Sequence, residues 1–218
     1  MSNNNRYLKI PLYFLSLVFF SYLEINIPRI YSVQTVPIIH HVITSSVSNY
    51  LLYNDTDLML NMFNTPKEEI SPLLSYFPIF SCAFGLYDLY NAIFMQKKID
   101  FILHGVLFYT VGVIFMHNEN FHWLYPGLLM ETSSVFLNLT VLPYDFIKYF
   151  FLVTFLFYRN IVFPYISIIF VKDKYVLFLE PKHYNEKIVI FSLFCINYLN
   201  FFWGYKIIKK LIRHIKNE

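Results

Sequence analysis

Charged residues are scarce in this sequence. Aspartate, glutamate, lysine and arginine make up 14% of its 218 residues, whereas an average soluble domain has roughly 25%. Hydrophobic side chains make up 57% and aromatic ones 21%. A soluble domain of this length could not bury so much apolar surface, because a large part of its surface must face water. The composition therefore excludes an ordinary soluble domain and predicts an integral membrane protein.

Several kinds of partner and site are not expected, because the residues that they need are missing or poorly placed. The net charge is only +3, and without a clustered basic face nucleic acid is not an expected partner. Both cysteines, Cys82 and Cys195, lie in apolar runs, which favours buried thiols over a disulfide. No HxxxH spacing occurs, and neither a metal site nor a cofactor is expected.

Alanine occurs only twice, and 4 arginines stand against 13 lysines and 17 asparagines. This bias is typical of AT-rich coding, as in a parasite or a large DNA virus. If the source is viral, the membrane that holds the protein would be the host's.

Apolar runs long enough to cross a bilayer, which needs about 20 residues, recur along the chain. We therefore predict an all-α, multi-pass transmembrane bundle of about seven spans around a polar cavity. The first run has no small-residue cleavage site after it, which favours a retained span over a signal peptide. The seven runs are residues 7–23, 33–53, 72–95, 101–117, 123–142, 146–171 and 188–208.

The strongest cluster of positive charge follows the last run, at Lys209, Lys210, Arg213 and Lys216. Because lysine and arginine are enriched in cytoplasmic segments of membrane proteins, we expect the C-terminus to lie in the cytoplasm.

Ionisable and amide side chains interrupt these apolar runs. A charge at the bilayer centre costs at least about 2.5–3.5 kcal/mol, so such groups face the interior of a bundle and are paired or functional. Counted from the expected cytoplasmic ends, they fall in the cytoplasmic half or near the middle. We expect them to form one polar cavity, lined by His40, His41, Asp88, His104, Glu131, Ser134, Asn138, Arg159 and Asn200.

Helical spacing supports an inward-facing arrangement. Glu131, Ser134 and Asn138 follow one another at i, i+3 and i+7 and share one helix face. Asp100 and His104 are four residues apart, so the carboxylate could orient the imidazole. Two structural alternatives stay open. Asp100 could be a helix-start carboxylate at the interface, and Arg159 with Glu131 could be an ion pair that fixes helix register.

Five motifs in order resemble the TLC family of membrane proteins. They are residues 85–89 (GLYDL), 100–104 (DFILH), 131–138 (ETSSVFLN), 155–159 (FLFYR) and 197–203 (NYLNFFW). The resemblance divides the chain into residues 1–29, an N-terminal span with the first loop, and residues 30–218, a TLC-like transmembrane domain.

The family includes ceramide synthases, which join acyl-CoA to a sphingoid amine, and small members linked to lipid sensing, lipid trafficking or membrane composition. The synthases resemble one another in an adjacent histidine pair and a downstream aspartate pair. Here Gly105 follows His104, no Asp-Asp occurs, and Val135 replaces the signature proline.

The chain thus looks more like the small, non-synthase members. The resemblance implies a protein of the endoplasmic reticulum or a related endomembrane that binds, senses or regulates membrane lipids. The alternative is an acyl-CoA-dependent acyltransferase similar to ceramide synthase, in which His104 acts as base and Asp100 orients it.

Overall fold

The computed structural model describes residues 4–26, 35–66, 69–118, 120–179 and 184–217. These residues form helices joined by short turns, with no strand among them. The expected start of the second span and the boundary at residues 29 and 30 lie outside the described residues.

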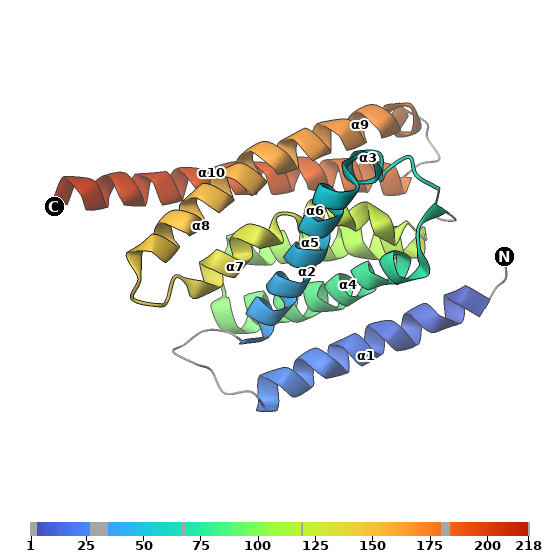
Figure 1. Cartoon of the computed structure of the whole chain (residues 1–218), viewed down its shortest axis with the longest axis horizontal. Helices are drawn as coiled ribbons and strands as arrows, with labels where there is room; N and C mark the ends of the chain where they lie inside the picture. The colour runs from blue at the N-terminus through green and yellow to red at the C-terminus, as the bar shows by residue number, and fades with distance from the viewer. Residues whose placement is uncertain (1–3, 27–34, 67–68, 119, 180–183, 218) are drawn as a thin grey trace.

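The helices follow one another in the order shown in Figure 1. The long ones are α1 (Asn4–Asn26), α2 (Thr35–Asn54), α4 (Pro72–Asn91), α5 (Ile99–His117), α8 (Asp145–Phe157), α9 (Phe163–Leu179) and α10 (Tyr184–Asn217). The short ones are α3 (Thr56–Leu60), η2 (Ala92–Gln96), η3 (Phe121–Leu124), α6 (Tyr125–Leu128), α7 (Glu131–Leu139) and η4 (Tyr158–Val162).

Among the described residues, three helices are long and apolar enough to cross a membrane: Ile99–His117, Asp145–Lys174 and Tyr184–Arg213. The other expected spans fall mainly on helical residues as well. Two histidines and three serines reduce the apolar character of α2. Residues 123–142 are divided among η3, α6 and α7.

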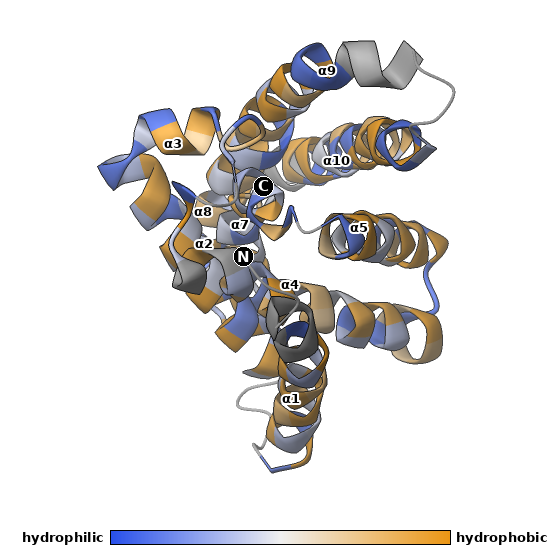
Figure 2. Ribbon diagram, turned by 90° about the vertical axis from the view of Figure 1, so that its right-hand side faces the viewer, coloured by the Kyte–Doolittle hydropathy of each residue, from blue (hydrophilic) through white to orange (hydrophobic). Residues whose placement is uncertain are grey.

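The long helices form a bundle in which neighbours pack side by side (Figures 1 and 2). α4 lies between α1 and α5, α5 also contacts α10, and α7 lies between α2 and α8. The outer surface of this bundle is rich in large apolar side chains, such as Val153, Phe194 and Tyr198, which are 63%, 65% and 71% exposed. Several polar side chains, such as those of His40 and Asn200, are fully buried. This distribution fits a bundle surrounded by lipid.

Close helix contact fixes α4 against α5. A Cβ at Gly112 of α5 would lie 2.9 Å from Sγ of Cys82 on α4, and one at Gly105 would lie 3.3 Å from Cα of Leu89. Small residues let membrane helices approach closely. The packing holds Asp88 of α4 near His104 of α5, and both residues line one cavity.

The helix from Asp145 to Leu179 contains a π-helical turn, η4, between α8 and α9. Such turns are rare and are often found at functional sites. Arg159 lies in this turn and is buried, 6% exposed.

Candidate functional site

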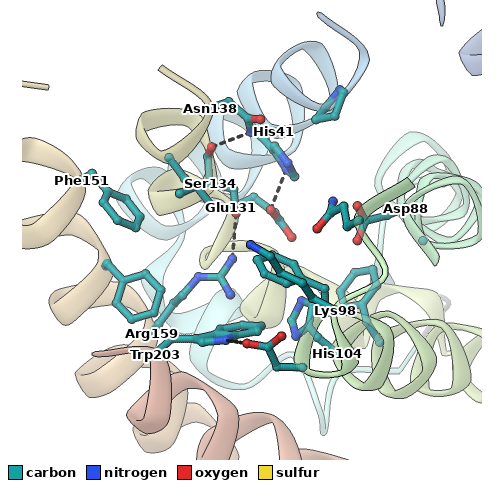
Figure 3. A pocket seen from close by; sticks show the side chains of 18 of the residues that line it. His41, Asp88, Lys98, His104, Glu131, Ser134, Asn138, Phe151, Arg159 and Trp203 are labelled. Carbon is teal, nitrogen blue, oxygen red and sulfur yellow. Dashed lines mark hydrogen bonds and ion pairs between the residues drawn. The ribbon is translucent and has the colours of Figure 1, made fainter. Parts of the chain in front are cut away.

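A cavity of about 660 Å³ lies between α2, α4, α5, α7, α8 and α10. Of the nine residues expected to line a polar cavity, seven line this one: His41, Asp88, His104, Glu131, Ser134, Asn138 and Arg159. Figure 3 shows several of these side chains pointing toward the same space from different helices.

His40 and Asn200 are buried just outside the lining residues. The His40 ring stacks on Phe84, which lines the cavity, with 3.7 Å between ring centroids, and its Nε2 lies 3.3 Å from Oγ of Ser81. Asn200 contacts Arg159 through a 3.4 Å hydrogen bond. Both residues therefore support groups in the cavity wall.

Arg159 is held by neutral groups. Its Nε donates to Oγ of Ser133 at 2.8 Å, Nη2 to Oγ of Ser134 at 2.7 Å, and Nη1 to Oδ1 of Asn200 at 3.4 Å. The ring of Phe155 lies 5.5 Å from the guanidinium carbon. In the described part of the chain, no carboxylate comes within ion-pair distance of Arg159, so the alternative of an Arg159–Glu131 pair is wrong.

Glu131 is paired with a histidine instead. Nδ1 of His41 lies 2.7 Å from Oε2 of Glu131, at ion-pair distance, and both side chains are about one tenth exposed. A buried oxygen of this kind retains capacity to accept a further donor.

Polar contacts fix the helices that carry these groups. Asn49 of α2 donates to Oγ1 of Thr132 on α7 at 2.8 Å, and its Oδ1 accepts from the hydroxyl of Tyr158 in η4 at 2.8 Å. Thr132 adjoins Glu131, and Tyr158 adjoins Arg159. One asparagine therefore sets the positions of the acidic and the basic group together.

Asp88 faces the cavity from α4, across from Arg159 in the view of Figure 3. The structure shows no hydrogen bond or ion pair to its carboxylate from other described residues. Asn138, by contrast, uses its amide to donate to the backbone oxygen of Ser134 at 2.8 Å. Asp88 thus leaves an acceptor open toward the cavity.

The mouth of the cavity is formed by the start of α5 and the later turns of α10. Oδ2 of Asp100 accepts from Nε1 of Trp203 at 2.9 Å and lies 3.5 Å from Nζ of Lys206. Lys98, which is exposed, lies at the same rim.

The expected hydrogen bond between Asp100 and His104 does not form. Nδ1 of His104 is buried without a hydrogen-bond partner among the described residues, and the ring lies 5.3 Å from that of Trp203. Asp100 turns toward α10 because the indole N–H and the lysine there offer two donors. That contact between distant segments cannot be read from spacing along one helix.

Ser133, Trp203 and Lys206 belong to the site but were not expected from the sequence. Ser133 has a visible signal, since it adjoins Ser134 in a run of three hydroxyl residues. In the part of the chain that the structure describes, no group of three or more histidine, cysteine or acidic residues could hold a metal ion. Both cysteines are free thiols.

The apolar outer surface, the membrane-length helices and the buried polar cavity define an integral membrane protein of the α-helical type. Within this class, the chain belongs to the TLC domain family, whose model matches residues 30–209. The match confirms the resemblance carried by the five motifs and leaves α1 outside the family domain. No curated protein and no solved structure matches the chain.

Proposed function

We propose that the chain binds the polar headgroup of a membrane lipid in the cavity, and that it senses or regulates membrane lipids through this binding. The observation that carries the proposal is the state of Arg159, a buried cation whose described partners are two hydroxyls and one amide. A charge inside a membrane is retained where it has a partner or a function.

A guanidinium has five N–H donors. The three hydrogen bonds use one N–H each on Nε, Nη1 and Nη2, so one N–H remains on Nη1 and one on Nη2. Arg159 lines the cavity. A phosphate, carboxylate or carbonyl oxygen of a bound headgroup would satisfy them, and arginine suits such oxygens because its donors form a rigid fork.

Two carboxylates that line the cavity, those of Asp88 and Glu131, suit the donor groups of a headgroup. The Asp88 carboxylate has no hydrogen-bond partner among the described residues, and Oε2 of Glu131 can accept a further donor beside Nδ1 of His41. Phe84, Phe108 and Phe151 supply apolar wall between the polar groups. A molecule with a polar end and a hydrocarbon chain matches both kinds of lining.

The proposal includes seven spans, a cytoplasmic C-terminus and residence in the endoplasmic reticulum or a related endomembrane. α10 has 34 residues and is about 51 Å long, which exceeds the roughly 30 Å hydrocarbon core. Its basic last turns would therefore leave the membrane. Lys98 and Lys206 lie at the cavity mouth on the same side, which supports a cavity that opens toward the cytoplasm.

Acyl transfer receives less support. A base at His104 would need a group that orients its imidazole. Asp100 bonds to Trp203 and Lys206 instead, and Nδ1 of His104 lacks a hydrogen-bond partner among the described residues. Binding without chemistry needs no such orientation, so it is the function that we propose.

The test uses the full chain purified in mild detergent, with bound lipid measured by native mass spectrometry. We expect wild type to carry lipid and Leu137→Trp, which fills the cavity from its wall, to lose it. Val141→Trp is the matched control, because Val141 is exposed one turn further on and does not line the cavity. A wild-type protein that carries no lipid and binds none from a panel of membrane lipids would refute the proposal.

A further inference from the structure

A second, smaller cavity of about 40 Å³ lies deeper in the bundle, between α5, the η3–α6 segment, α9 and α10. Its walls are almost entirely apolar and include Val111, Phe115, Phe163 and Ile196. Phe108 lines both this chamber and the larger polar cavity. The two spaces therefore share a side chain.

The chamber offers little to a water molecule. Its one hydroxyl, on Ser167, donates to the backbone oxygen of Phe163 at 2.8 Å and accepts from Nδ2 of Asn197 at 2.9 Å. Nε1 of Trp123 lacks a partner among the described residues, but a stably bound water needs two to four polar partners. Apolar cavities of this kind stay dry and accept apolar groups.

A thin layer of side chains separates the chamber from the polar groups. Met130 lines the chamber, and its Sδ lies 3.5 Å from Nδ2 of Asn200, the residue that accepts from Arg159. On the other side, Phe108 packs on Gly85, whose Cβ, if present, would lie 3.2 Å from Cδ1 of the ring. The chamber is thus adjacent to the part of the cavity where Arg159 lies.

We infer that the chamber receives the end of the acyl chain of the bound lipid, and that Phe108 limits the length of that chain. The inference rests on the proposed function, since it takes the polar end of the lipid to lie at Arg159. Phe108 divides the apolar space available to the chain, so a smaller side chain at this position joins the chamber to the cavity.

Two substitutions change the volume open to the acyl chain in opposite directions. Phe108→Ala removes the dividing ring and admits longer chains. Gly127→Ala narrows the chamber, because Gly127 lines it and an added Cβ would meet nothing closer than Cε2 of Phe163 at 4.0 Å. Alanine also favours a helix over glycine, so this variant keeps the test valid if Phe108→Ala fails to fold.

The experiment measures binding of saturated fatty acids from lauric to arachidic acid to the full chain in detergent, by competition in native mass spectrometry. Each methylene that enters apolar surroundings should strengthen binding roughly fourfold. We expect the preferred chain to lengthen in Phe108→Ala and to shorten in Gly127→Ala. Phe136→Ala is the control, since Phe136 stacks on Phe150 away from both cavities.

The same chain-length preference in wild type and in both chamber variants would overturn the inference. If the protein also carries its own lipid from the membrane, that result leaves the proposed function intact. Absence of both co-purified lipid and fatty-acid binding would overturn the proposed function, and the inference with it.

Discussion

Replacing Arg159 by methionine should abolish lipid binding while leaving the free energy of unfolding close to that of wild type. The substitution removes three hydrogen bonds, to Ser133, Ser134 and Asn200. Side-chain hydrogen bonds between membrane helices average about 0.6 kcal/mol, so their loss costs about 2 kcal/mol. Methionine keeps an unbranched side chain that can remain against the ring of Phe155.

A gain in the free energy of unfolding offsets the loss of these hydrogen bonds. A guanidinium within the membrane costs roughly 2.5–3.5 kcal/mol, and methionine does not carry that cost. The difference is about 0.5–1.5 kcal/mol, so Arg159→Met should unfold within about 1.5 kcal/mol of wild type. The same variant should lose its bound lipid, because the only arginine that lines the cavity among the described residues is gone.

The assay combines chemical unfolding in detergent with native mass spectrometry of the bound lipid. Arg213→Met is the matched control, since Arg213 is exposed on α10 beyond the cavity and should change neither measurement. A variant at Arg159 that unfolds several kcal/mol more easily and still carries lipid would show that the arginine serves the fold, and the reasoning would be refuted.

Three further outcomes are expected. Gly112→Ala should destabilise the protein by about 1–3 kcal/mol, because the new Cβ would lie 2.9 Å from Sγ of Cys82; in chemical unfolding, adding Cys82→Ala should restore most of the loss. His104→Ala should leave acyl-CoA turnover by membranes that express the protein unchanged, and a loss of turnover would favour acyl transfer. A protease site added after Glu218 should be cut in sealed microsomes without detergent, whereas protection would place the C-terminus in the lumen.

Much of the architecture was predictable because hydrocarbon restricts what a chain can do. Apolar runs must be helical, since backbone groups have no other partner in lipid, and the expected spans fall mainly on helical residues in the described part of the chain. Three of those helices are long and apolar enough to cross a membrane. The convergence of Asp88, Glu131 and Arg159 on one cavity follows from the same restriction. A sequence alone shows that such groups must avoid lipid, and this narrows where they can lie.

It was harder to predict which side chains contact one another inside the cavity. Glu131 contacts His41 rather than Arg159, and Asp100 contacts Trp203 rather than His104. These choices depend on how helices far apart in sequence are rotated and aligned. Helical spacing gives neighbours on one helix but carries no information about neighbours on another.

The π-helical turn η4 could not be predicted from the sequence. Residues 155–162 contain no proline or glycine, yet the backbone widens to a π-turn at Tyr158–Val162. The turn brings Arg159 within reach of Ser133, Ser134 and Asn200 together.

If the chain binds lipid as we propose, buried polar groups from separate helices hold the headgroup. An experimental structure of the full chain in a bilayer nanodisc tests it most directly. We predict density for a polar headgroup in contact with the Arg159 guanidinium and hydrocarbon density leading toward Phe108. A cavity that contains only water, or an Arg159 side chain turned outward to the bilayer, would contradict the account.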